Sequence, residues 1–177
     1  MIPSVNRSAA VLFAALALVL WVAPVAGTDS SIRVPMMWPT VGHVTQAYGC
    51  TGFYAEPRRG NCRHFHLGID IANRSGTPIR AVADGVVTHV GWDPWWRGRN
   101  RAWTVVISHG HGVRTFYAHL QQRQIEGIRR GAHVVRGQVI GRMGMTGHAT
   151  GPHLHFAVLL YSNWVDPHRF IVTALQH

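Results

Sequence analysis

The chain has 177 residues, enough for one ordinary domain and a short additional segment but too few for two full hydrophobic cores. Hydrophobic residues make up 47% and charged residues 14%, which excludes an intrinsically disordered chain. Seventeen basic residues, all arginine, outnumber seven acidic ones. The resulting net charge of +10 indicates an anionic partner such as nucleic acid, an anionic membrane or a negatively charged cell wall.

The beginning of the chain is typical of a secretory signal peptide. Arg7 precedes an apolar run over residues 8–22, and the small residues Ala26 and Gly27 follow it. The run is shorter than the ~20 residues that span a bilayer, so we expect residues 1–27 to be removed on export. An uncleaved anchor is the alternative. Removal of the segment would place the protein outside the cell or in the cell envelope, with no stable membrane span.

The mature chain is expected to contain a linker over residues 28–37 and a single domain over residues 38–177. An oxidising compartment allows Cys50 and Cys62, 62 − 50 = 12 positions apart, to form a disulfide. Closing that loop would contribute ~3 kcal/mol in the chain-entropy model. Two unpaired cysteines are the alternative, and a zinc pair is disfavoured because the chain has no C-x-x-C spacing.

Short β-branched runs separated by glycine predict strands of ordinary length. The predicted strands cover residues 85–90, 103–108, 113–119, 138–142 and 153–160. Residues 110–112 (GHG) predict a tight hairpin connection between the second and third of these runs. Helical character is expected only in a turn within residues 121–130. The chain is therefore predicted to be mainly β, with antiparallel sheets and few or short helices.

Two groups of residues have the chemistry of metal ligands. His153 and His155 project from the same face of their predicted strand, in an arrangement that can grip a metal ion. His66 and Asp70 would lie about 13 Å apart on a fully extended strand, too far to bind one ion. We expect a bend at Gly68, where glycine can supply an unusual backbone angle. In either group the spacing can also arise by chance.

A ligand set of His66, Asp70 and His155 would leave the fourth position of a tetrahedral zinc open for water, the pattern of a catalytic site. His119 ends an apolar strand, and either His119 or His153 could contact that water or a developing oxyanion. The sequence has no H-E-x-x-H motif, and its only glutamates are Glu56 and Glu126. Imidazole is therefore expected to act as the acid and base.

Three separated motifs resemble those of the lysostaphin-type zinc metallopeptidases. They are H-L-G-I-D at 66–70, Y-A-H-L at 117–120 and T-G-P-H-L-H-F at 150–156, and the likeness extends in order over roughly residues 38–172. The resemblance implies a mainly antiparallel β fold with a groove that holds one zinc. It also implies that His66, Asp70 and His155 are the zinc ligands, with His119 and His153 as catalytic residues.

The same resemblance implies a secreted endopeptidase that hydrolyses peptide bonds in the stems or cross-bridges of bacterial peptidoglycan. The alternative is a catalytically silent wall-binding protein that activates other wall hydrolases, but all five site positions are intact here. Ala157 replaces a glutamate that family members commonly carry at that position. The bond that is cleaved is left open by the sequence.

The segment from Trp92 to Trp103 is unusually rich in tryptophan and arginine. It is expected either to line the substrate groove, with aromatic and cationic contacts to sugar rings or anionic stems, or to form an exposed loop that covers a sheet edge. Similar residues bind single-stranded nucleic acid. An exported chain with a complete set of metal ligands makes nucleic acid an unexpected partner.

Overall fold

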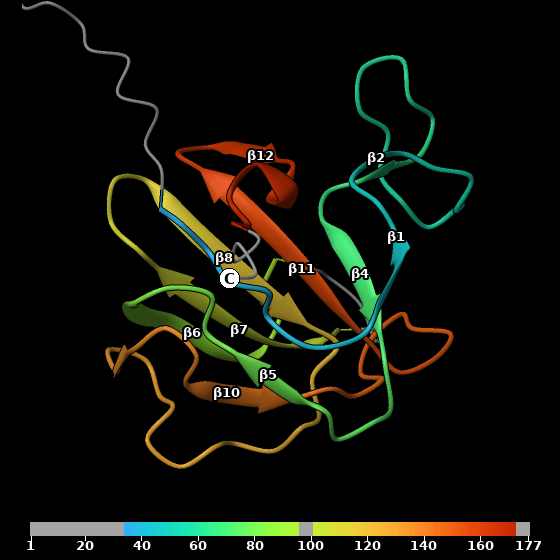
Figure 1. Cartoon of the computed structure of the whole chain (residues 1–177). Coiled ribbons are helices and arrows are strands. Elements are labelled where there is room, and N and C mark those ends of the chain that lie inside the picture. Colours follow the sequence, from blue (N-terminus) through green and yellow to red (C-terminus); the bar gives the residue numbers. More distant parts are fainter. Residues whose placement is uncertain (1–33, 96–100, 173–177) are drawn as a thin grey trace, which may run out of the picture. The chain divides into compact units, whose positions relative to one another are not determined.

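The computed structural model describes residues 34–95 and 101–172 (Figure 1). The expected signal peptide and most of the expected linker lie outside these residues. The first strands are β1 (His43–Gln46), β2 (Gly49–Cys50), β3 (Phe65–His66), β4 (Ile69–Ala72), β5 (Pro78–Arg80) and β6 (Gly85–Trp92). They are followed by β7 (Trp103–Ser108), β8 (Val113–Ala118), β9 (His133–Val134), β10 (Val139–Arg142), β11 (His153–Leu160), β12 (Asn163–Val165) and the 3₁₀ helix η1 (Pro167–Arg169).

An eight-stranded antiparallel sheet forms the centre of the fold (Figure 1). Its order is β1-β4-β11-β8-β7-β6-β9, and β12 pairs with the C-terminal half of β11 on the edge where β4 pairs with its N-terminal half. Two small sheets, β5 with β10 and β2 with β3, complete the described strands. The prediction of a mainly antiparallel β protein is confirmed, and β7 and β8 form the predicted hairpin.

The expected helical turn within residues 121–130 is wrong. That segment consists of isolated turns, one of them closed by a hydrogen bond from Ile128 N to the Ile125 carbonyl. Gly127 adopts a φ of +77°, in the left-handed region, so a right-handed helix cannot continue through it. Within the described residues, no helix is both long and apolar enough to cross a membrane.

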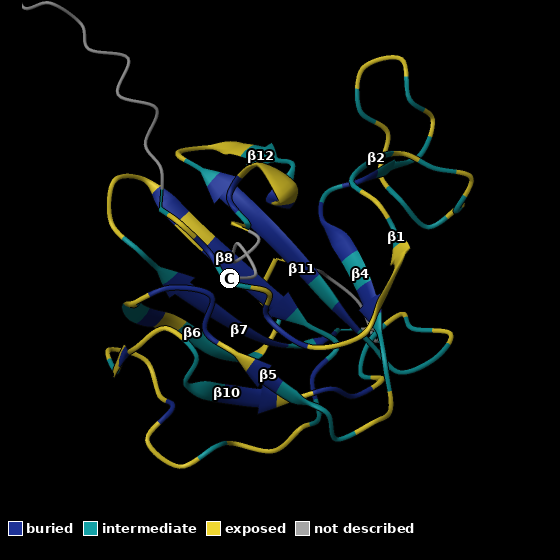
Figure 2. Ribbon diagram, in the orientation of Figure 1, coloured by how far each residue is buried: buried dark blue, intermediate teal, exposed yellow. Residues whose placement is uncertain are grey.

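The two faces of the central sheet have different surroundings, because side chains alternate between them along each strand. On β11, Leu154, Phe156 and Val158 are fully buried in the main hydrophobic core (Figure 2). We call this side of the sheet the packed face. Ile79 of β5 and Ile140 of β10 belong to the same core, so the small sheet supplies part of its cover.

The opposite side of the sheet carries a second, smaller apolar cluster. It contains Val106 of β7, Phe116 of β8 and Ala157 and Leu159 of β11, with Trp164 of β12 packed against it. We call this side the groove face, because an open cavity lies on it. The sheet thus has one sealed side that stabilises the fold and one accessible side.

Segments outside the main sheet are tied to it at two places. Met36, in the part of the expected linker that is described, is fully buried in the main core and forms backbone hydrogen bonds with Phe170 and Val172. The predicted disulfide between Cys50 and Cys62 is present and closes the loop between β2 and β3. This loop leads directly into the first of the candidate ligand residues.

Candidate active site

His66 on β3 and Asp70 on β4 are joined by a short connection through Gly68, and β4 pairs with β11. Asp70 is the direct cross-strand partner of His155, so the sheet register itself places two candidate ligands side by side. Gly68, between them, does not adopt a left-handed φ, and the expected unusual backbone angle is wrong. A Cβ at Gly68 would lie 2.4 Å from the Phe156 carbonyl oxygen, so glycine is required there for close approach to β11.

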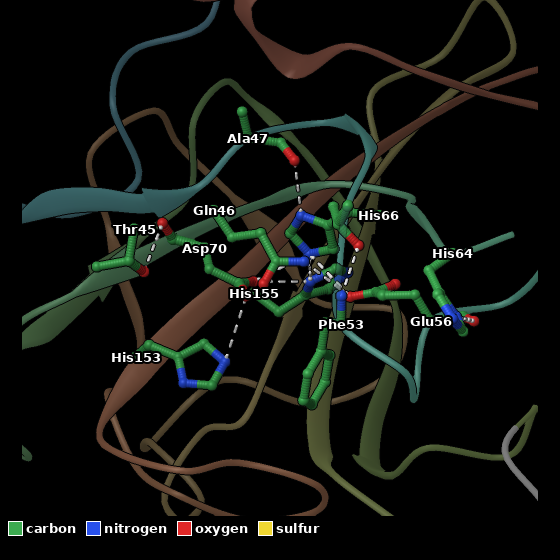
Figure 3. Close-up of polar contacts among 11 residues, drawn as sticks. Thr45, Gln46, Ala47, Phe53, Glu56, His64, His66, Asp70, His153 and His155 are labelled. Atoms are coloured by element: carbon green, nitrogen blue, oxygen red, sulfur yellow. Dashed lines mark hydrogen bonds and ion pairs between the residues drawn. The ribbon is translucent and has the colours of Figure 1, made fainter. Parts of the chain in front are cut away.

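The three predicted ligand residues place one donor atom each around a common point (Figure 3). His66 Nε2 lies 2.9 Å from His155 Nδ1 and 3.2 Å from Asp70 Oδ1, and His155 Nδ1 lies 3.0 Å from Asp70 Oδ1. Corners of a tetrahedron with metal bonds of about 2.0–2.2 Å are roughly 3.3–3.6 Å apart, a few tenths of an ångström more than the separations of these atoms. Two nitrogens and one carboxylate oxygen at these spacings fit a zinc ion.

The surrounding backbone orients the ligands. His66 Nδ1 donates to the Ala47 carbonyl at 3.1 Å, which leaves Nε2 with a free lone pair for a metal. Burial opposes ionisation of Asp70, but hydrogen bonds from His155 and His66 hold the pKa of its carboxyl well below the usual range. Burial alone would lower the pKa of His66, but the hydrogen bond and the charge of Asp70 outweigh burial, so the net effect is a raised pKa. The ionised Asp70 carboxylate is therefore suited to hold a cation.

His119 and His153 lie beside this group, with ring centroids 4.5 Å apart. His119 Nδ1 donates to the Thr146 carbonyl at 2.7 Å, and His153 Nδ1 donates to the Gly151 carbonyl at 2.9 Å, assigning the remaining proton-free nitrogen of each neutral ring to Nε2. Burial, reinforced by His155, lowers the pKa of His119 to about 4. All five predicted site residues line one cavity of about 150 Å³.

Glu56 is a site residue that the sequence reasoning did not find. It lines the same cavity, with its Oε1 4.0 Å from His66 Nε2 and accepting a hydrogen bond of 3.1 Å from Gln46 Nε2. Glu56 stands ten positions before His66 in no recognisable motif. Its only indirect signal was the cysteine pair, because the disulfide between Cys50 and Cys62 holds the loop that carries it close to β3.

A larger cavity of about 750 Å³ extends from this centre along the groove face. Phe53, Glu56 and His119 line both cavities, so the two adjoin. The floor of the large cavity is formed by Thr104, Phe116, Ala118, Ala157 and Leu159, and Arg114 lies at the end of β8 opposite His119. Ala157 shares the His155 side of β11, as strand alternation predicts, and is almost completely buried.

The tryptophan-rich segment contributes to the wall of this groove. Trp95 is 59% exposed, lines the large cavity and packs edge to face against Phe116 with ring centroids 5.5 Å apart. Trp92 instead packs against Trp103, with centroids 5.5 Å apart, and does not line the groove. Trp96 lies outside the described residues. The groove expectation thus holds for Trp95, whereas Trp92 belongs to β6, where it pairs with Trp103.

The fold and the site together define a mainly β protein with a candidate mononuclear metal centre at one end of a groove. The chain belongs to peptidase family M23, whose model matches residues 64–167. It is 45% identical over 105 residues to the DD-carboxypeptidase/endopeptidase Mpg of Neisseria meningitidis serogroup B, a match that covers 58% of this chain and 22% of that protein. The chain therefore spans about a fifth of the length of this curated relative.

Two solved structures show the same fold. The catalytic domain of the antimicrobial peptidase lysostaphin from Staphylococcus simulans matches with a TM-score of 0.57 and 29% identity, over 73% of this chain and 91% of that one. A zinc containing peptidase from Vibrio cholerae matches with a TM-score of 0.58 and 30% identity, over 76% of this chain and 39% of that one. The lysostaphin-type fold expected from the three motifs is confirmed.

Proposed function

We propose that the chain is a zinc endopeptidase that acts outside the cytoplasm and hydrolyses peptide bonds in the stems or cross-bridges of peptidoglycan. The observation that carries the proposal is the ligand group, in which His66, Asp70 and His155 place three donor atoms within 3.2 Å of one another. Membership of the M23 peptidases supports hydrolysis of a peptide bond. The chain's similarity to Mpg, a DD-carboxypeptidase/endopeptidase, and to lysostaphin, an antimicrobial peptidase, supports an endopeptidase.

The side chains of this centre have distinct roles in the proposed reaction. Zinc, when bound, would polarise the scissile carbonyl and lower the pKa of a water molecule. His66, Asp70 and His155 would hold the ion; a hydrogen bond to the Ala47 carbonyl orients the His66 ring, and cross-strand pairing places His155 opposite Asp70. His119 and His153 line the cavity and bind the backbone through Nδ1. Their Nε2 atoms would therefore accept and return protons and hydrogen-bond the oxyanion.

The groove supplies the binding surface for an extended peptide. Its apolar floor, from Ala118 through Phe116 and Ala157 to Leu159, suits small and aliphatic peptide segments. Arg114 stands four positions before Ala118 on β8, about 13 Å away in an extended strand. A carboxylate three or four residues from the scissile bond would therefore meet a cationic side chain. The net charge of +10 further supports adsorption to an anionic wall.

Digestion of purified peptidoglycans that differ in cross-bridge chemistry tests this proposal. The protein over residues 28–177, loaded with zinc, should release fragments with new amino termini that mass spectrometry assigns to one type of bond. Chelation should abolish the release and added zinc should restore it. Adsorption to the wall without new termini, under conditions where zinc is held, would contradict hydrolysis and favour a silent activator of other wall hydrolases.

A further inference from the structure

Glu56 is an acidic residue outside the three sequence motifs, yet it lies next to the candidate metal centre. Its side chain is only 14% exposed, and it lies beside the ligand group with Oε1 4.0 Å from His66 Nε2 (Figure 3). Gln46 Nε2 donates to the same oxygen at 3.1 Å. Gln46 itself is the cross-strand neighbour of Asp70, next to a bulge in β1. The carboxylate and its amide partner are thus both built around the candidate metal centre.

The backbone of the loop fixes Glu56 in this place. Glu56 N donates to the Phe53 carbonyl at 3.1 Å, and Phe65 N donates to the Pro57 carbonyl at 2.9 Å. The disulfide between Cys50 and Cys62 closes the loop around it. These restraints on both sides of Glu56 hold the carboxylate toward β3, so its proximity to His66 is a property of the folded loop.

The charge of Glu56 has no permanent cationic partner among the residues that the structure describes. Its one ion pair there is with His66. While its Nε2 binds a metal, the His66 ring is neutral, because its one proton is then on Nδ1, which donates to the Ala47 carbonyl. A half-buried carboxylate needs a compensating charge, and a cation held by the ligand group can supply it.

The charges around the candidate metal centre also favour a bound cation as the partner of Glu56. A divalent ion bound by two neutral imidazoles and the Asp70 carboxylate keeps one net positive charge, and Glu56 would cancel it. Its 4.0 Å separation from His66 Nε2 exceeds the 2.9–3.2 Å between the three ligand atoms, which places Glu56 just outside their triangle. A carboxylate at that distance can act on the ion through its charge and through a water molecule.

We propose that the carboxylate of Glu56, positioned by Gln46, stabilises the cation held by His66, Asp70 and His155. The proposal rests on the proposed function for the presence of a metal, and it assigns Glu56 to metal retention. Outer partners of this kind typically contribute 10- to 100-fold to metal affinity. Loss of the negative charge of Glu56 should therefore weaken zinc binding by about that factor.

Zinc affinity of the whole mature protein, measured by competition with a chromophoric chelator, tests the assignment. E56Q keeps the size of the side chain and removes its charge, and it should bind zinc about 10- to 100-fold more weakly than the parent. E56D keeps the charge and should lose less. E126Q removes the same charge from an exposed residue of another loop, and its affinity should stay within about twofold of the parent.

A second pair of variants tests how Glu56 is positioned. Q46A should weaken zinc binding, and the double variant Q46A/E56A should bind no more weakly than E56A alone, because Gln46 acts through the carboxylate. Far-UV circular dichroism of each variant identifies any loss of fold. Equal zinc affinity of folded E56Q, E126Q and parent protein would overturn this proposal alone. A folded parent that holds no zinc would overturn both this proposal and the proposed function.

Discussion

The packed face and the groove face are made by the same strands, yet they are built for different purposes. On β11, Leu154 and Phe156 are completely buried in the core, whereas His153 and His155, one position away from each, face a cavity. On β8, Tyr117 is buried and its neighbour Phe116 forms the groove floor. Period-two alternation therefore lets a single rigid sheet support the fold on one side and a site on the other.

The packed face also explains how the side chains of so small a candidate site are held in fixed positions. Asp70 and His155 are held by cross-strand pairing, which is restrained by the packed residues on the opposite side. Gly68 allows the connection between β3 and β4 to approach the Phe156 carbonyl closely. Substitutions on the two faces should therefore separate cleanly, with the groove face controlling metal binding and turnover and the packed face controlling the free energy of unfolding.

The largest effect is expected from Asp70, the charged ligand of the proposed centre. D70A removes the only carboxylate of the ligand triangle, and zinc affinity should fall by more than the 10- to 100-fold that an outer partner contributes. Elemental analysis after gel filtration measures the remaining zinc, and cleavage should disappear with it. Full zinc occupancy in folded D70A would remove Asp70 from the ligand set.

The next effect is expected from the two histidines that do not belong to the triangle. H119A and H153A should keep one zinc per chain and slow peptide hydrolysis by about 10²- to 10⁴-fold, the usual contribution of a general acid or base. Metal content and turnover are measured on the same preparations. If either variant loses its zinc, that histidine belongs among the ligands; parent turnover in both would refute their catalytic role.

On the packed face, Phe156 tests the other half of the comparison. F156A opens a cavity in the core beside Tyr117, and the free energy of unfolding should fall by about 3–5 kcal/mol. L159A, on the groove face of the same strand, should cost less because its surroundings are already open to a cavity. Urea unfolding at a temperature where both variants are folded gives the two values.

Acid sensitivity should also distinguish the faces, through His109 at the end of the packed face. His109 Nδ1 donates to the Asp84 carbonyl and Nε2 accepts from Thr115 Oγ1, both at 2.7 Å, and Thr115 is hydrogen-bonded to buried Tyr117. Burial lowers the pKa of His109, so below its unfolded value of about 6.5 the unfolded chain binds the proton more readily. Stability is therefore expected to fall as the pH falls below that value.

The test compares the free energy of unfolding of the parent and of H109Q at pH 7.5 and pH 5.5. The parent should lose more stability between these two values than H109Q, since only the parent carries the imidazole. Titration of the site histidines contributes equally to both proteins and cancels in the comparison. An identical loss in the two proteins would show that His109 is not responsible.

Much of the fold was predictable because it depends on local patterns. Runs of β-branched residues gave the strands that became β6, β7, β8, β10 and β11, and the H-x-H alternation placed His153 and His155 on one face. The positions of His66 and Asp70 were also identified, although the reason for the bend was not. Gly68 is required by an approach of β11, which is 85 or more positions away and leaves no trace in the local sequence.

The rest depends on tertiary contacts that no local pattern encodes. Glu56 and Gln46 reach the site because a loop and a bulged strand fold over it, and neither residue type is distinctive at its position. The expected helical turn near Gly127 failed because a single left-handed residue ends the turn. The pairing of β5 with β10, which completes the core, joins segments about sixty residues apart.

The smallest expected effect concerns the wall of the groove, where Trp92 at the end of β6 and Trp95 just beyond it allow a matched comparison. Trp95 lines the cavity and is 59% exposed, whereas Trp92 packs against Trp103 outside the groove. W95A should raise the KM for peptide hydrolysis by about 2- to 10-fold, since an aromatic contact contributes about 0.5–1.5 kcal/mol. Its thermal unfolding and zinc content should match the parent, because so exposed a side chain adds little to the core. W92A should show the reverse, a lower unfolding temperature with unchanged KM. Destabilisation in W95A with unchanged cleavage would assign Trp95 to packing and restrict the substrate-binding surface to the apolar floor of the groove.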